Sequence, residues 1–222
     1  MLAENRPRLA VLMGDLVGSE RARSLQAVHR VFNEAVGFAN EQYASAIESP
    51  LTITLGDEFQ GLARTLSQAW SIVAALRLRL LVADVSCRFV IGVAQLETPV
   101  NPKAAWNMMG RGLAEARDKL NDKRAQNAYR FSFPGETLVE PLLDAVGDSL
   151  TEAEAAWTPT QRKYYAAVRS ASGSNAEVAK SLGVTPRSLY KVLHAARADF
   201  HRRQCAVLER ALTELDARYG LQ

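Results

Sequence analysis

Two aspartates stand where apolar, strand-like stretches end. Asp15 lies in "RLAVLMGDLVG", and Asp57 lies in "LTITLGDEFQG", where Glu58 follows it. Carboxylates brought into one place repel one another unless a proton or a cation neutralises them. Mg²⁺ takes one or two carboxylates together with water and the phosphate oxygens of a ligand. The pair therefore predicts a Mg²⁺ (or Mn²⁺) site with Asp15 and Asp57 as ligands and a bound nucleotide; a solvated turn is the alternative.

The segment after Asp15, "LVGSERAR", leads into a predicted helix. Free N–H groups in such a loop, and the N-terminus of the helix behind it, suit phosphate oxygens. We therefore expect this loop to bind the nucleotide, with the Leu16 carbonyl as a further metal ligand. The nucleotide-binding residues would be Leu16, Val17, Gly18 and Ser19. Four basic residues either reach the phosphates or form an exposed helix end and loop: Lys119, Lys123, Arg124 and Arg130.

Short strands that alternate with helices must position these residues. Apolar patterning predicts strands in 8–18, 51–55, 59–63, 86–97 and 128–133, and helices in 21–45, 66–84 and 103–120. One tight turn, at Gly56, joins two of the strands as a hairpin. This order favours a ferredoxin-like α/β sheet with helices on one face. The strands that end at Asp15 and at the hairpin are neighbours in such a sheet, so their carboxylates should share one space.

Four motifs carry a family resemblance. "GDLVGS", "TITLGDEFQG", "RFVIGVAQLET" and "GRGLAEARDKL" occur in the order and spacing of the SatD family of bacterial proteins, which the chain resembles over residues 8–133. These motifs are similar in turn to the palm domain of class III nucleotide cyclases and, more loosely, to GGDEF diguanylate cyclases. The resemblance implies a cyclase-like palm in which Asp15 and Asp57 hold two metal ions on a nucleoside triphosphate. Gly18 and Gly56 match the same motifs.

The chain departs from the cyclase pattern at two positions. Ile53 stands where cyclases carry a purine-selecting lysine, and Leu113 stands where they carry an asparagine. Arg117 matches the arginine that steadies the transition state, and it would be the catalytic residue if the protein is an enzyme. The resemblance thus implies a palm that binds a nucleotide without cyclising it. A nucleotide cyclase or nucleotidyltransferase that uses the two metal-binding aspartates is the alternative.

The C-terminal third contains a different motif. In "NAEVAKSLGVTPRSLYKVLHAAR" a first helix would open at Ser174 or Asn175, both good N-caps. Gly183 would end that helix, because a C-cap often needs a positive φ. Thr185 would cap a second helix that starts at Pro186, where a missing N–H costs nothing. This layout is typical of a helix-turn-helix; a three-helix module for protein contacts is the alternative.

The positive charge of the C-terminal third favours double-stranded DNA as its partner. Residues 160–222 hold 11 Lys and Arg against 5 Asp and Glu, whereas residues 1–150 hold 16 against 17. Phosphate neutralisation supplies most non-specific affinity for DNA, and the start of the second helix is the end that meets base edges. The expected DNA-binding residues are Arg187, Ser188, Tyr190 and Lys191 on the second helix, with Lys180, Arg162 and Lys163 among the phosphate contacts.

The expected architecture has two domains: a palm in 1–134, a helical linker in 135–157, and a helix-turn-helix domain with a C-terminal helix in 158–222. An apolar stripe on the last helix would either pair with a second copy, giving a homodimer, or fold back on its own core. Two cysteines without a CxxC pair, no signal-peptide pattern and no apolar run of ~18–20 residues indicate a cytoplasmic protein without a membrane partner. The sequence therefore predicts a DNA-binding transcriptional regulator.

Overall fold

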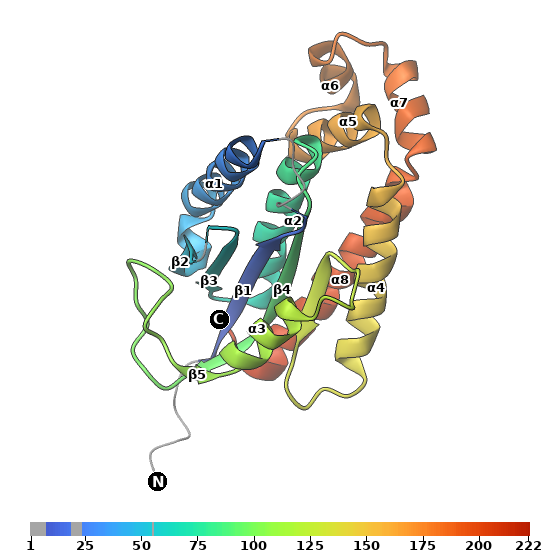
Figure 1. The fold of residues 1–222 in the computed structure, drawn as a ribbon. Coiled ribbons are helices and arrows are strands. Elements are labelled where there is room, and N and C mark those ends of the chain that lie inside the picture. Colours follow the sequence, from blue (N-terminus) through green and yellow to red (C-terminus); the bar gives the residue numbers. More distant parts are fainter. Residues whose placement is uncertain (1–7, 19–23, 55) are drawn as a thin grey trace.

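A six-stranded sheet forms the centre of the molecule in the computed structural model, which describes residues 8–18, 24–54 and 56–222 (Figure 1). The strand order is β2-β3-β1-β4-β5, and β6 pairs with β4 in parallel. The strands are β1 (Arg8–Leu16), β2 (Ile47–Ile53), β3 (Glu58–Ala63), β4 (Cys87–Leu96), β5 (Gly110–Arg111) and β6 (Tyr129–Ser132). The other pairs are antiparallel. Strand β1 lies between β3 and β4, and its place beside the hairpin strand β3 is as expected.

One face of the sheet carries the main core. Helices α1 (Leu25–Gln42) and α2 (Leu66–Val82) pack there, and Phe59 of β3 lies between the rings of Phe32 and Phe89. Alternate residues of β1, Ala10 and Leu12, point into this core because side chains of a strand alternate between its faces. Helix α1 runs through Gly37 without a break.

The expectation of helices on one face only is also wrong. Helix α3 (Leu113–Asn121) covers the opposite face, where Leu9, Val11 and Met13 of β1 form a second core. Both sets of alternating residues in β1 are apolar, so both faces of the strand must be covered. Arg117 belongs to α3 and lies on this second face.

Helix α3 is shorter than the predicted helix in 103–120. Residues 97–109 take an irregular path, and the chain then adds β5 to the edge of β4 before the helix begins at Leu113. Gly112 has φ +89, and a Cβ there would collide with the carbonyl oxygen of Val93. This glycine therefore fixes the late helix start, which its position inside an apparently helical pattern concealed.

The segment 135–157, expected as a linker, is instead part of the folded core. It contains α4 (Val139–Ala155), which packs against β6 and buries Leu143 and Leu150. Glu154, near the C-terminal end of α4, is fully buried (0% exposed).

Three short helices follow, and their ends match the sequence signals. They are α5 (Pro159–Ser170), α6 (Asn175–Ser181) and α7 (Pro186–Ala195). Ser174 caps α6 in a capping box with Glu177, Gly183 follows with φ +70, and Thr185 caps α7 with proline at the first helical position. These three helices share a separate core cluster that includes Trp157, Tyr165, Leu189 and Leu193. We call α5–α7 the helical unit.

The last helix does not belong to that unit. Helix α8 (Ala198–Tyr219) buries Leu208, Leu212 and Leu215 in the core of the sheet and lies against α2 and α4 (Figure 1). Its Asp216 accepts hydrogen bonds from the backbone N–H groups of Leu66 (2.6 Å) and Ser67 (3.2 Å) at the start of α2. Of the two alternatives for this stripe, a second copy or the chain's own core, the structure has the stripe inside the chain. The expected domain 158–222 therefore loses its final helix to the sheet.

The helical unit is joined to the sheet layer at both ends. Helix α4 precedes it and α8 follows it, and the indole N–H of Trp157 donates to the carbonyl of Ala196 (2.8 Å) where the two connections meet. Within the described ranges, no helix combines the length and apolar character that a membrane crossing needs.

Candidate functional site

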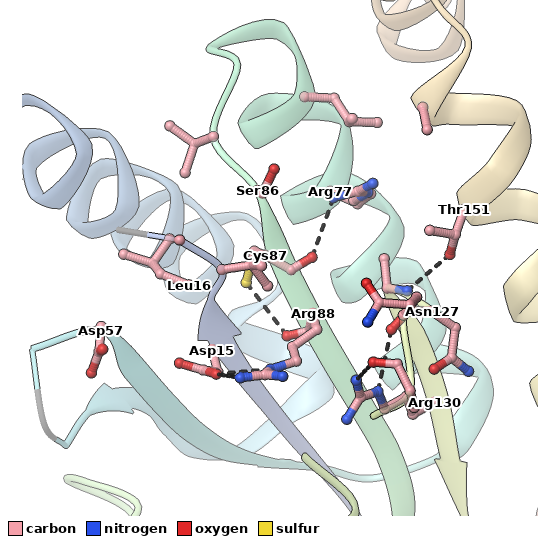
Figure 2. Close-up of a pocket in the computed structure, with 18 of the residues that line it drawn as sticks. Asp15, Leu16, Asp57, Arg77, Ser86, Cys87, Arg88, Asn127, Arg130 and Thr151 are labelled. Atoms are coloured by element: carbon pink, nitrogen blue, oxygen red, sulfur yellow. Dashed lines mark hydrogen bonds and ion pairs between the residues drawn. The ribbon is translucent and has the colours of Figure 1, made fainter. Parts of the chain in front are cut away.

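A cavity of about 800 Å³ lies where β1 ends and β4 begins (Figure 2). Its wall combines the β1 end, the turn between α2 and β4, the loop between α3 and β6, and the C-terminal part of α4. Arg162 of the helical unit closes one side. Asp15 and Asp57 both line this cavity, so the structure brings the two predicted metal ligands to one site.

Asp15 is held by an arginine that the sequence analysis did not consider. Arg88 faces Asp15 across β1 and β4, and it donates from Nε (2.8 Å) and Nη2 (2.5 Å) to the same carboxylate oxygen (Figure 2). The Asp15 side chain is 14% exposed and the Arg88 side chain is 13% exposed, so the pair is largely shielded from water. The guanidinium already supplies the positive charge that this carboxylate needs.

The residues fit a bound metal ion poorly. Asp57 is exposed on the hairpin, and Asp15 shares its carboxylate with the cationic Arg88. A divalent ion placed at Asp15 would be repelled by that guanidinium. In the part of the chain that the structure describes, no three His, Cys, Asp or Glu side chains gather in a way that could hold an ion.

Arg117 of α3 contacts two side chains of strand β3. Its Nη2 donates to the side-chain oxygen of Gln60 (2.8 Å), and its Nε lies 3.8 Å from Glu58. Burial raises the pKa of Glu58; the charge of Arg117 opposes this shift, and the charges of Asp15 and Asp57 add to it. The arginine expected to steady a transition state therefore neutralises a buried carboxylate of β3, and it does not line the cavity.

The expected phosphate loop is only partly available. The N–H of Leu16 donates to the carbonyl of Asp57 (2.9 Å), and the N–H of Val17 donates to the carbonyl of Ser86 (2.9 Å). The expectation that these two N–H groups cradle phosphates is therefore wrong, because the sheet continues through them. Gly18 lines the cavity with φ +69, and Ser19 lies outside the described residues.

The four basic residues of the α3–β6 region divide between two roles. Arg130 is buried and donates to five carbonyls at the end of α3 and in the following loop: those of Lys119, Leu120, Asp122, Ala125 and Asn127. Lys119 forms ion pairs with Glu140 (2.5 Å) and Asp144 (2.6 Å) of α4. Arg124 is exposed, and Lys123 lines the cavity. Only Lys123 thus keeps a position suited to a phosphate.

A buried polar network forms the inner wall. Glu154 accepts hydrogen bonds from Arg77 Nε (2.7 Å) and from the hydroxyl of Tyr129 (2.5 Å). His201 Nε2 lies 3.0 Å from the same carboxylate, and His201 Nδ1 lies 2.7 Å from the hydroxyl of Tyr165. Arg77 lines the cavity and Tyr165 belongs to α5, so the network connects the cavity to the helical unit. Only the spatial arrangement reveals it, since its members are far apart in sequence.

The predicted DNA-binding residues fall into two groups. Arg162 does not face outward, because its Nη1 donates to Asp84 (2.6 Å) and its side chain is 18% exposed; its expected contact with DNA phosphate is wrong. The others are exposed on α5, α6 and α7: Lys163, Lys180, Arg187, Ser188, Tyr190 and Lys191. They lie on the same helical unit, on the outside of its core cluster.

Comparison with known proteins establishes the family. The sequence profile of the SatD family matches residues 9–207, so the chain belongs to the SatD family. The match extends beyond residue 133, the limit of the expected resemblance, and therefore takes in the helical unit and part of α8. No curated protein matches the chain.

Solved structures of two cyclases and of one cyclase-like protein have a distant likeness to this chain. A bacterial light-regulated adenylyl cyclase has a TM-score of 0.42 and 11% identity, over 57% of this chain and 43% of that one. A class III adenylyl cyclase-like ATP-binding protein from Pseudomonas aeruginosa has a TM-score of 0.38 and 16% identity, over 57% and 33%. The guanylyl cyclase Cya2 has a TM-score of 0.36 and 13% identity, over 53% and 71%. The chain thus spans less than half the length of the first two.

Proposed function

We propose that this protein is a DNA-binding transcriptional regulator, in which the helical unit contacts double-stranded DNA and the sheet carries a ligand site. The outer surface of α7 is the observation that supports this function. Four polar side chains are exposed within the first six residues of that helix: Arg187, Ser188, Tyr190 and Lys191. In known helix-turn-helix proteins, the corresponding end of the second helix meets base edges in the major groove.

The charge of the helical unit supports the same function. Residues 159–197 contain seven Lys and Arg and one Glu, and Lys163 and Lys180 are exposed beside α7. Clustered positive charge on a small unit attracts the phosphate backbone of DNA and gives binding that weakens with salt. Gly183 follows α6 with φ +70 and Thr185 caps α7, so the turn between these two helices has defined ends.

The test is a binding titration with labelled duplex DNA at several salt concentrations. We expect Arg187→Ala with Lys191→Ala to weaken binding and to relax its sequence preference, since these side chains would meet base edges. Arg203→Ala with Arg210→Ala removes the same charge from the exposed face of α8 and should change little. If the wild type fails to bind duplex DNA at low salt, or if both double variants lose affinity equally, the regulator function is wrong.

The second candidate is a nucleotide cyclase or nucleotidyltransferase. The presence of Asp15 and Asp57 in one cavity favours it, whereas the pairing of Asp15 with Arg88 and the position of Arg117 oppose it. Incubation with each nucleoside triphosphate and Mn²⁺ tests it directly. A cyclic or transferred product that Asp57→Asn abolishes would make the protein an enzyme.

A further inference from the structure

Two buried polar atoms in the cavity wall lack a partner. They are Oδ1 of Asn127 and Nε of Arg162, and neither has a hydrogen-bond partner among the described residues. Asn127 is 6% exposed, and its Nδ2 donates to the carbonyl of Tyr129 (3.1 Å). Leaving such a group unsatisfied typically costs about 1–3 kcal/mol, so buried polar atoms normally have a partner. Both residues line the cavity, which makes its contents the natural source of these partners.

The position of Arg162 suits an anion. Its Nη1 is tied to Asp84 in the turn between α2 and β4, which fixes the guanidinium against the cavity wall. The Nε–H belongs to the side of the guanidinium that a phosphate or carboxylate engages with two parallel hydrogen bonds. Lys123 lines the same cavity from the loop before β6. Arg162 and Lys123 line the same cavity as Asp15, whose negative charge is already neutralised by Arg88.

The two unpartnered atoms require different chemistry from one ligand. Asn127 Oδ1 needs a donor, such as a hydroxyl or an amino group, whereas Arg162 Nε needs a negatively charged acceptor. A cavity of about 800 Å³ has the size of a site for a compact organic molecule. A nucleotide offers both groups at this size: phosphate oxygens, and donors on its sugar or base.

We propose that the cavity binds a nucleotide without a divalent cation, with its phosphate on Arg162 and a sugar or base donor on Asn127. Arg88 supplies at Asp15 the charge that a metal ion would otherwise bring. Asp15, Arg88 and Asn127 belong to the sheet layer and Arg162 to α5, so the ligand contacts both parts of the chain. Its action on DNA rests on the function proposed above, whereas the binding itself does not.

Calorimetric titration of the full chain with adenosine and guanosine mono-, di- and triphosphates, in EDTA and in Mg²⁺, tests this site. We expect one of them to bind in EDTA. Arg162→Gln should weaken that binding about 10- to 100-fold, the loss typical of a hydrogen bond to a charged group. Asn127→Leu should weaken it about tenfold. Arg203→Gln, the same change on the exposed face of α8, should leave it unchanged.

Thermal unfolding of each variant shows whether it is folded. If Arg162→Gln does not fold, Asn127→Leu still tests the proposed site. Binding that requires Mg²⁺ and is lost in Asp57→Asn would overturn the proposal in favour of a metal site. No binding of any of these nucleotides, or an equal loss in Arg162→Gln and Arg203→Gln, would also overturn it. DNA affinity is measured on the same variants without nucleotide. A protein that binds nucleotide but no DNA refutes the regulator function and leaves this site standing.

Discussion

Arg88 and Asp15 face each other across two antiparallel strands and form a pair with two hydrogen bonds to one carboxylate oxygen. The arginine thus supplies beside Asp15 a positive charge that a metal ion would otherwise bring. A cation that is covalently part of the chain cannot be removed by a chelator or replaced by another ion. The site is therefore permanently neutralised at Asp15, whereas Asp57 remains exposed.

Removing this arginine should expose a cation site. We expect Mn²⁺ to leave the melting temperature of the wild type unchanged. Arg88→Met should have a lower melting temperature, because it leaves Asp15 unpaired in a largely buried place. Mn²⁺ should then stabilise this variant, by about 2.7 kcal/mol at roughly 100 times its Kd.

The control is Arg64→Met, which removes a more exposed ion pair with Glu48 and should gain no response to Mn²⁺. A wild type that Mn²⁺ stabilises as strongly as Arg88→Met would contradict the view that the guanidinium blocks the metal.

Glu58 should reduce stability at neutral pH. Burial raises its pKa, with Asp15 and Asp57 adding to the shift and Arg117 opposing it. A carboxyl whose pKa is higher in the folded state binds a proton more readily there, so stability rises as the pH falls towards its ordinary value of 4.5. We therefore expect Glu58→Gln to raise the melting temperature at pH 7. The gain should disappear below about pH 4, where the carboxyl is protonated in both states.

Melting curves from about pH 4 to pH 8 measure this effect. Glu48→Gln on the neighbouring strand β2, where the carboxylate is 33% exposed and pairs with Arg64, provides the control. A Glu58→Gln variant that is less stable than the wild type at pH 7 would show that the contact with Arg117 outweighs burial.

Glu154 should have the opposite dependence on pH. Burial raises its pKa, but Arg77 and the hydrogen bonds from His201 and Tyr129 outweigh burial and leave the pKa below its ordinary value of 4.5. A lowered pKa gives stability that is fully present above pH 4.5 and lost as the pH falls below it. Glu154→Gln leaves Arg77 buried without its anion and should cost about 3–5 kcal/mol at pH 7.

Urea unfolding at pH 7 and at about pH 4 measures both effects. The variant should lose less stability than the wild type over this interval, because the titrating group is gone. Glu152→Gln lies on the exposed side of the same helix and should behave as the wild type. A change of less than about 1 kcal/mol in Glu154→Gln would mean that the network contributes little to the fold.

The last helix should stabilise the sheet. Leu212 is 0% exposed in the main core, so Leu212→Ala should lower the free energy of unfolding by about 2–5 kcal/mol. Val207 lies on the same helix and is 57% exposed, so Val207→Ala should change it by less than about 0.5 kcal/mol. Chemical unfolding followed by tryptophan fluorescence, to which Trp70 of the main core contributes, is the measurement. Equal effects of both substitutions would place α8 outside the core.

The sequence predicted best those features that depend on neighbouring residues. Ser174, Gly183 and Thr185 act on backbone groups within a few positions, so the ends of α6 and α7 matched the predictions. The hairpin of β2 and β3 also matched, because the turn at Gly56 restricts how these two strands can pair. Both are short-range constraints that composition and spacing express directly.

Features that depend on distant partners were missed. The apolar stripe of α8 indicated that something covers it, yet the pattern does not say whether that is another copy or the sheet of the same chain. Strand alternation could have suggested the Asp15–Arg88 pair, because it puts Arg88 on the same face of β4 as Val90 and on the other face from Phe89. The pairing nevertheless depends on the register between β1 and β4. Asp15 and Arg88 are 73 positions apart in sequence, and short-range patterns do not fix the register of such distant strands.

The two connections of the helical unit limit how it can move. A unit held by a single flexible linker would sample many orientations. This one leaves the sheet layer through α4 and returns through α8, and Trp157 ties the two connections together at Ala196. These two connections keep the unit beside the sheet layer. A protease cut in the turn at 171–174 would therefore leave both pieces docked, each anchored by its own long helix, and would not release a mobile fragment.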